Sequence, residues 1–334
     1  MATPRSEQFD PNEPGTYLVT SRCVRRAFLW GEDPVTGRDY SHRKRWVIER
    51  TAFLLDQFCF DLGGYSILSN HMHQLVQNDP ERLGELSDQE VARRALRLCP
   101  PQDGSQEPVE VTDEHVRALV EDRERLSEWR RRLGDISWFM RFLKEPIARR
   151  ANKEDRVTGR FFEGRFGLRK VTDVAGLLFA TAYVDLNVIR AAMAETPEGS
   201  DFTSIQQRIE ARWLSQAGAS RPEGEPQLPE LVPIGDLIPG FDLDRYLAVV
   251  DLMGREIKQG KRGVIPPDLP PILERLDIDA EAWAAGLHRR QLHGSVIGSA
   301  AGVAAEAARR GRKWLVNAVD LSGAGGERGS PAPR

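Results

Sequence analysis

Two histidines one residue apart, His71 and His73, are the side chains of this sequence best spaced to do chemistry. They lie in a run from Tyr65 to Val76 in which apolar and polar residues alternate, a pattern typical of a β-strand. Because successive strand side chains point to opposite faces, both imidazoles project from the same face. Two imidazoles on a stiff backbone can form half of a divalent-metal site. The alternative is that both are ordinary surface or core histidines.

A second group of functional side chains lies in a helix predicted from Val174 to about Met193. Tyr183 and Asn187 are four residues apart, so a phenol and an amide share one face of this helix. A tyrosine beside a metal-bound phosphate can attack it and form a covalent phosphotyrosine. We expect Asp185 and Arg190 on other faces. The alternative is a tyrosine that simply packs in the core.

Positive charge is concentrated between Arg141 and Lys170, which hold ten Lys or Arg against four Asp or Glu. The segment therefore carries a net charge of +6, although the whole chain carries −3. Phenylalanines are interspersed with these charged residues. A protein surface that binds single-stranded DNA combines positive charge with aromatic side chains on which the bases stack. We expect phosphate contacts from Arg165 and Arg169 above all, and DNA binding also from Arg160 and Lys170. The alternatives are a solvated helix face and, for Phe162 and Phe166, a place in the core.

The elements that position the two histidines follow a strand–helix–strand order. A first strand is predicted over Gly15 to Cys23, and a helix over Arg43 to Leu62 with apolar residues near 3.6-residue spacing. Gly63 and Gly64 are expected to stop this helix, with the histidine strand beginning at once. This order is compatible with a mixed sheet that carries helices on one face.

The middle of the chain is predicted to be mostly helical. Residues 79–134 are dense in charge and contain helical patches around Pro100-Pro101, which indicates a helical insertion. An amphipathic helix is predicted over Ile136 to Ala151, followed by a basic strand or hairpin over Phe161 to Val171.

Further helices and a linker are predicted after the tyrosine helix. A helix covers Ile205 to Leu214, and a Pro/Gly-rich linker covers 215–240. Residues 241–320 are expected to form a small helical region, with helices over Asp244–Gln259, Pro271–Leu287 and Ser299–Val319. Residues 321–334 are expected to be a disordered tail.

Composition restricts the class of protein. In 334 residues, 40% are hydrophobic and 29% charged, as in globular proteins, and no apolar run approaches the ~18 residues of a membrane span. Residues 1–15 lack the apolar stretch of a secretory signal. The three cysteines are widely separated and form no Cys-x-x-Cys pair, which argues against a disulfide framework and a cysteine zinc site. We therefore expect a reduced, cytoplasmic setting and no membrane partner.

Taken together in chain order, these segments resemble the single-tyrosine transposases of the HUH superfamily, the insertion-sequence 200-like family. The resemblance is strongest to the branch associated with repetitive extragenic palindromic elements. It covers about residues 12–210 and is carried by five segments: 15–22, 68–73, 161–166, 182–191 and 201–204. The 79–134 insertion and the residues beyond the linker lie outside it.

The resemblance implies both a fold and a reaction. The fold would be α+β, a ferredoxin-like antiparallel sheet with packed helices, to which the helical insertion and a helical C-terminal extension are added. His71, His73 and Asn187 would bind Mg²⁺ or Mn²⁺. Tyr183 would attack a single-stranded DNA phosphate, giving a 5′-phosphotyrosine and a free 3′-OH. The partner would be single-stranded DNA with hairpin ends, and the enzyme would act as a homodimer.

Two departures from the family pattern leave other functions open. Val188 stands where the family commonly has a proline after the asparagine, and Ser69 precedes Asn70 where a proline is frequent. One alternative is therefore a catalytically silent or domesticated DNA-binding relative. The second is a metal-dependent hydrolase unrelated to DNA, which would use His71 and His73 with a carboxylate.

Overall fold

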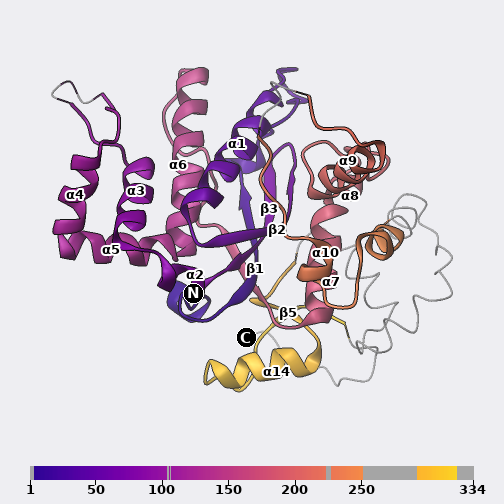
Figure 1. Cartoon of the computed structure of the whole chain (residues 1–334). Helices are drawn as coiled ribbons and strands as arrows, with labels where there is room; N and C mark the ends of the chain where they lie inside the picture. Colours follow the sequence, from indigo (N-terminus) through magenta and orange to yellow (C-terminus); the bar gives the residue numbers. More distant parts are fainter. Residues whose placement is uncertain (1–3, 104, 106, 223–226, 251–291, 322–334) are drawn as a thin grey trace, which may run out of the picture.

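The computed structural model describes residues 4–103, 105, 107–222, 227–250 and 292–321. A six-stranded mixed sheet with the order β2-β3-β1-β4-β5-β6 runs through the middle of the molecule, and helices cover both of its faces (Figure 1). The strands are β1 (Gly15–Arg22), β2 (Phe60–Ile67), β3 (His71–Asn78), β4 (Gly167–Val171), β5 (Val296–Gly298) and β6 (Asn317–Asp320).

Strands β1 to β4 form the antiparallel part of this sheet. Both β1 and β2 pair antiparallel with β3, and β4 pairs antiparallel with the other edge of β1. With α1 (His42–Gln57) between β1 and β2, and α6 (Ile136–Asp155) between β3 and β4, this is the split β-α-β arrangement of ferredoxin-like folds. The predicted α+β class is confirmed. The sheet is mixed because β5 and β6 add to β4 in parallel.

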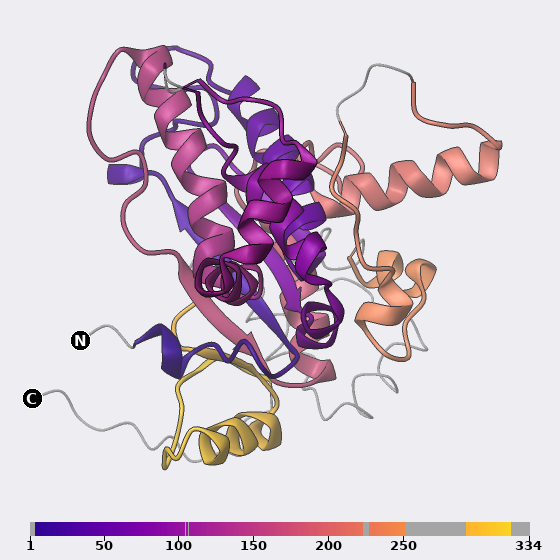
Figure 2. The same cartoon turned by 60° about the vertical axis from the view of Figure 1, so that its left-hand side comes forward.

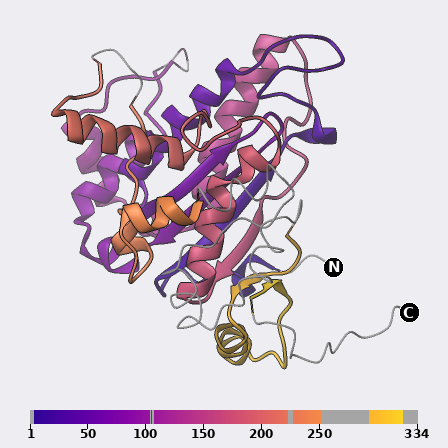
Figure 3. The same cartoon turned by 90° about the vertical axis from the view of Figure 1, so that its right-hand side faces the viewer.

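Alternation along the strands creates two separate cores. Tyr17 and Val19 of β1 belong to the core under α1 and α6, whereas Leu18 belongs to the core under α7 (Val174–Asp185). Figure 2 shows α6 and the helices of the insertion in front of the sheet, and Figure 3 shows α7 lying across the opposite face. A side chain on β1 or β3 therefore faces α7 only at every second position.

The segment 79–134 is helical, as predicted. It contains α2 (Pro80–Glu85), α3 (Asp88–Leu98), α4 (Asp113–Glu121) and α5 (Arg123–Leu133). Side chains that precede each helix accept hydrogen bonds from its first turn, and these N-caps are Asp79, Ser87, Thr112 and Asp122. Val91 and Trp129 pack into the core shared with α1 and α6, so the insertion extends that face of the molecule.

The glycine pair was wrongly assigned to a helix end. Helix α1 ends at Gln57 rather than Leu62, and Gly63 and Gly64 lie inside β2, where the pairing with β3 shifts register. A Cβ on Gly63 would come within 2.8 Å of a terminal methyl of Leu237, so glycine lets the leucine side chain pack closely against the strand here. The histidine strand consequently does not follow the glycines directly. It begins at His71, after β2 has ended at Ile67.

The predicted tyrosine helix is divided in two. Asp173 caps α7 by accepting from the amide of Gly176, and α7 ends at Asp185, before a short α8 (Asn187–Arg190). The chain continues through α9 (Ser204–Ala217), which corresponds to the helix expected over 205–214, and α10 (Ile234–Leu237) within the predicted linker.

The C-terminal region contributes strands as well as helices. The helix expected over Ser299–Val319 covers only Ala300–Arg309 (α14), and it lies between β5 and β6. Residues 243–250 are helical, but the remainder of the helix expected to Gln259, the helix over Pro271–Leu287 and residues 322–334 lie outside the described residues. The described part of this region therefore completes the central sheet.

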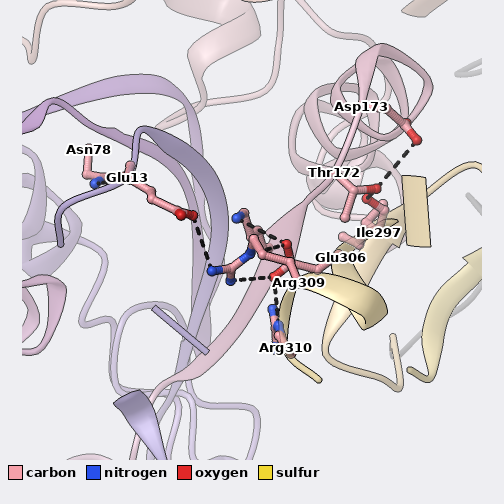
Figure 4. A network of polar contacts seen from close by, with 9 residues as sticks. Glu13, Asn78, Thr172, Asp173, Ile297, Glu306, Arg309 and Arg310 are labelled. Carbon is pink, nitrogen blue, oxygen red and sulfur yellow. Dashed lines mark hydrogen bonds and ion pairs between the residues drawn. The ribbon is translucent and has the colours of Figure 1, made fainter. Parts of the chain in front are cut away.

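A polar network attaches α14 to the sheet (Figure 4). Glu306 pairs with Lys170 of β4 at 3.2 Å and also with Arg309 and Arg310 on its own helix. Arg309 reaches Glu13, next to the start of β1, at 3.2 Å. These contacts join the C-terminal segment to both β1 and β4, at the end of their pairing where Thr16 lies opposite Val171. Among the helices that the structure describes, none is long and apolar enough to span a membrane.

Candidate active site

His71 and His73 lie on the face of β3 that α7 covers. Both belong to the alternating set that includes Leu75, a residue of the core under α7. Their rings meet edge to face, with centroids 5.1 Å apart. In the antiparallel pairing with β1, Thr20 lies opposite His73 and Arg22 lies opposite His71. The structure thus brings the two predicted imidazoles together at one end of the sheet.

Each imidazole uses its Nδ1 atom in a hydrogen bond within the protein. Nδ1 of His71 lies 2.7 Å from Oδ1 of Asn70, and Nδ1 of His73 lies 3.1 Å from the hydroxyl of Thr20. Metal-binding histidines commonly engage their second ring nitrogen in this way, which fixes the ring orientation. This arrangement leaves the Nε2 atoms of both rings for a ligand such as a metal ion.

Both histidines are held in the neutral form. Burial lowers the pKa of His71 to about 4, and the nearby charges of Arg22 and Arg190 act in the same direction. Burial also lowers the pKa of His73 well below its ordinary value, with further contributions from His71 and the surrounding arginines. Neutral imidazole is the form that coordinates metal ions, so no proton must be displaced near neutral pH.

Tyr183 of α7 contacts His73 directly. The two rings meet nearly at right angles, at 83°, with centroids 5.5 Å apart, and Phe179 stacks on the tyrosine ring with a centroid distance of 5.9 Å. Only 2% of Tyr183 is exposed, and what it exposes lines a pocket. The predicted nucleophile is therefore held rigidly beside the predicted metal ligand.

Arg190 lies over the ring of Tyr183, with the guanidinium carbon 4.6 Å from the ring centroid. We expected this residue on another face, and that expectation was wrong. Leu186, between α7 and α8, keeps a right-handed helical conformation, so the spacing of seven residues, close to two helical turns, still brings the two side chains together. Asp185 does lie elsewhere: it is buried, and it accepts hydrogen bonds from Ser204 and Tyr246.

A pocket of about 240 Å³ opens beside the tyrosine. It is lined by polar and charged side chains from β1, β3 and the segment around β4, among them Thr20, Arg22, His73, Glu163, Arg165 and Arg169. Three arginines against one glutamate make this pocket electropositive. Such a pocket suits a phosphate group, for which arginine offers paired donors.

The four predicted DNA-binding residues separate into two groups. Arg165 and Arg169 line the pocket, and Arg169 also donates to the backbone carbonyl of Leu292. Lys170 lies on the opposite face of β4 and is ion-paired with Glu306, and Arg160 lies exposed before Phe161, outside the pocket lining. The Phe162 side chain is buried, as its core alternative anticipated.

Asn187 occupies the first position of α8 and is 4% exposed. Among the described residues, no hydrogen bond connects its side chain to either histidine, and its buried Nδ2 has no partner. The part of the chain that the structure describes also contains no cluster of three or more His, Cys, Asp or Glu suited to a metal. Two neutral imidazoles, together with the buried amide four residues after Tyr183, fit a divalent ion that takes its remaining ligands from oxygen atoms.

Sequence reasoning missed several residues of the site, among them Thr20, Arg22, Leu292 and Arg190. Thr20 and Arg22 share the α7 face of β1 with Leu18, so the alternation of β1 could have indicated them. The seven-residue spacing from Tyr183 could have indicated Arg190. Leu292 comes from the C-terminal region, and no local pattern connects it to the site.

Comparisons with known proteins give one weak likeness. No family model matches the sequence, and no curated protein matches it. Among solved structures, a REP-associated tyrosine transposase bound to a REP hairpin is similar, with 11% identity and a TM-score of 0.36. The match covers 65% of this chain and 92% of that chain. A likeness of this size defines neither the fold nor the function of this chain.

Proposed function

We propose that this protein cleaves and rejoins single-stranded DNA, with Tyr183 as the nucleophile and a divalent ion, Mg²⁺ or Mn²⁺, held by His71 and His73. The observation that supports this most directly is the contact between the rings of Tyr183 and His73 at the wall of an electropositive pocket. A phenol, an imidazole and three arginines line this one space. Asn187 is the proposed third protein ligand.

The reaction is a transesterification. The phenolic oxygen of Tyr183 forms a bond to phosphorus, the bond from phosphorus to the 3′-oxygen breaks, and that oxygen leaves as a 3′-hydroxyl. The phenol loses one proton and the 3′-oxygen gains one, so no external reactant is needed. A 5′-phosphotyrosine remains, and attack by another 3′-hydroxyl reverses the step and joins a new strand.

The residues of this chain supply binding and orientation. Arg165 and Arg169 are placed to bind the phosphate, and Arg190 and Phe179 hold the tyrosine ring. A divalent ion, when bound, supplies polarisation of the phosphate and stabilises its developing charge. Hairpin-ended single strands as substrate and a homodimer as the working form belong to the same proposal.

The test is a covalent adduct between the protein and labelled hairpin-ended single-stranded DNA in the presence of Mn²⁺. A strand labelled at its 3′ end should travel with the protein after denaturation, whereas a label at the 5′ end should appear on a released fragment. Tyr183→Phe should abolish the adduct. The matched control is Tyr40→Phe, because the Tyr40 ring packs beneath Arg43 and does not line the pocket.

Two other results would favour the alternatives. Salt-dependent DNA binding without an adduct from either version would indicate a DNA-binding protein that lacks turnover. Hydrolysis of small phosphate or carboxylate esters, without any binding of single-stranded DNA, would indicate a hydrolase.

A further inference from the structure

We infer that Asn70 is a positioning residue that fixes the tautomer of His71 and so aims its Nε2 lone pair into the site. A turn at Arg25 and Arg26 in turn holds Asn70. This inference deepens the proposed function, on which it rests for the role of His71 as a metal ligand.

The orientation of the Asn70 amide follows from its two partners. Its Nδ2 donates to the backbone carbonyl of Arg26 at 3.1 Å. Because a backbone carbonyl can only accept, the amide must present its nitrogen on that side. The amide oxygen therefore faces Nδ1 of His71, 2.7 Å away. Since this oxygen can also only accept, Nδ1 of His71 must carry the hydrogen.

A neutral imidazole with its hydrogen on Nδ1 has its lone pair on Nε2, the nitrogen that remains for a ligand. Asn70 thus selects one tautomer without any charged group. The partner of His73 does not make the same selection, because the hydroxyl of Thr20 can either donate or accept. The two histidines therefore differ in how firmly their hydrogen positions are fixed.

The turn that holds Asn70 has a strained backbone. Arg25 and Arg26 are consecutive residues with positive φ angles, 53° and 58°, in the region that favours glycine. Two backbone hydrogen bonds connect the segment to the residues before β3: Cys23 donates to Asn70 at 2.8 Å, and Trp30 donates to Ser69 at 2.9 Å. Strain of this kind persists only where the surroundings enforce it, and here its effect is to present the Arg26 carbonyl to Asn70.

The buried side chain of Trp30 anchors this turn. Its ring is fully buried and packs against Phe161 and Phe162, at centroid distances of 5.9 and 5.7 Å. Because the backbone amide of Trp30 also bonds to Ser69, this anchor joins the turn to the residues just before β3.

The first test measures the tautomer directly, on metal-free protein without DNA. In protein with ¹⁵N-labelled histidine, long-range ¹H–¹⁵N correlation spectra at neutral pH should show His71 with its hydrogen on Nδ1. Asn70→Asp loses the bond to the Arg26 carbonyl but keeps an acceptor oxygen for Nδ1, so His71 should retain that tautomer. Asn70→Ala removes the acceptor and should move the His71 signals toward the form with hydrogen on Nε2.

The second test measures Mn²⁺ affinity by calorimetry. Asn70→Ala should weaken binding by about 10- to 100-fold, the range typical for loss of a hydrogen-bond partner behind a metal ligand, while Asn70→Asp should restore it. Asn78→Ala is the matched control. Asn78 ends the same strand and makes the same kind of bond, from Nδ2 to the carbonyl of Glu13 at 2.8 Å, but it lies far from the histidines along β3. Its loss should leave Mn²⁺ affinity unchanged.

A wild-type His71 with its hydrogen on Nε2 would overturn the inference, as would an Asn70→Ala variant with an unchanged tautomer. The failure of the proposed function gives a different pattern. If wild-type protein forms no DNA adduct or binds no Mn²⁺, the proposed function fails, whereas the spectra of metal-free protein still decide the role of Asn70. Thermal unfolding of each variant shows whether it has kept its fold.

Discussion

The ring of Tyr183 meets the ring of His73 nearly at right angles, with their centroids 5.5 Å apart. One residue comes from α7 and the other from β3, so the contact depends on how the helix packs on the sheet. Alternation along β3 turns His73 toward α7, and the apolar side chains of α7 fix the depth at which the tyrosine lies. The spacing between Tyr183 and His73 is therefore a property of the core.

Loss of the hydroxyl that holds His73 should slow the reaction. Thr20→Val removes the partner of Nδ1, and we expect adduct formation to slow by about 10- to 100-fold at limiting Mn²⁺. Thr20→Ser keeps the hydroxyl and should react at nearly the wild-type rate. The measurement is the initial rate of adduct formation over a range of Mn²⁺ concentrations. Equal rates in the Val and Ser variants would show that this hydrogen bond does not matter.

Local patterns predicted the elements whose periodicity is long enough to recognise. The first strand was expected over 15–23 and is found as Gly15–Arg22, and the amphipathic helix expected from Ile136 begins at that residue and continues to Asp155. The alternation of β3 indicated that His71 and His73 share a face, and in the structure that face turns His73 toward Tyr183.

The remaining features depend on long-range contacts or on ambiguous residues. Strands β5 and β6 are three and four residues long, too short for a pattern, and they exist because β4 offers an open edge. Gly63 could equally have ended a helix or allowed close packing in a strand, since both uses require the absence of a Cβ. Asn70 was visible in the sequence, but its role depends on a carbonyl presented by a distant turn.

Two neighbouring cations on β4 should behave differently toward DNA. Arg169 lines the pocket, so Arg169→Gln should weaken binding of single-stranded DNA and reduce the slope of log K against log salt by about 1. Lys170 is ion-paired with Glu306 on the other face, so Lys170→Gln should leave that slope unchanged and lower the melting temperature. Binding titrations at several salt concentrations, with melting curves, separate the two effects.

An equal loss of slope in both variants would contradict this assignment. It would mean that the Lys170 ion pair opens when DNA binds, and that the earlier expectation of a DNA contact from Lys170 is correct.

Acid should remove the stabilising effect of Glu306. Burial alone raises the pKa of this carboxyl, but hydrogen bonds from Arg309 and Arg310, with the charge of Lys170, outweigh it and lower the pKa to about 2. A group whose pKa is lower in the folded state stabilises the fold above its unfolded pKa, here 4.5, and loses that effect as the pH falls toward 2. Glu306→Gln should therefore lower the free energy of unfolding by about 1–2 kcal/mol at pH 7, since Lys170 and Arg310 lose their charged partner and solvent screens part of that interaction.

The free energy of unfolding, measured by urea denaturation at several pH values from 5 down to 2, should differ less and less between wild type and Glu306→Gln. Glu128→Gln is the control, because the ion pair of Glu128 with Arg132 lies within one helix and is largely exposed on the Glu128 side. If the difference in the free energy of unfolding between wild type and Glu306→Gln stays constant over this range, the predicted pH dependence is wrong.

Relief of the strained turn should stabilise the protein without disturbing Asn70. Arg26 has an exposed side chain and a φ of 58°, so Arg26→Gly removes a Cβ clash of about 1–2 kcal/mol but adds freedom to the unfolded chain. We expect a net gain of about 0.5 kcal/mol in urea denaturation. The control is Ala27→Gly, at an ordinary φ of −62°, which relieves no strain and should lower the free energy of unfolding by about 0.5 kcal/mol. Because the bond to Asn70 uses the backbone carbonyl of Arg26, the glycine variant should keep the wild-type His71 tautomer. A changed tautomer would show instead that the strain itself, rather than the position of the carbonyl, orients the amide.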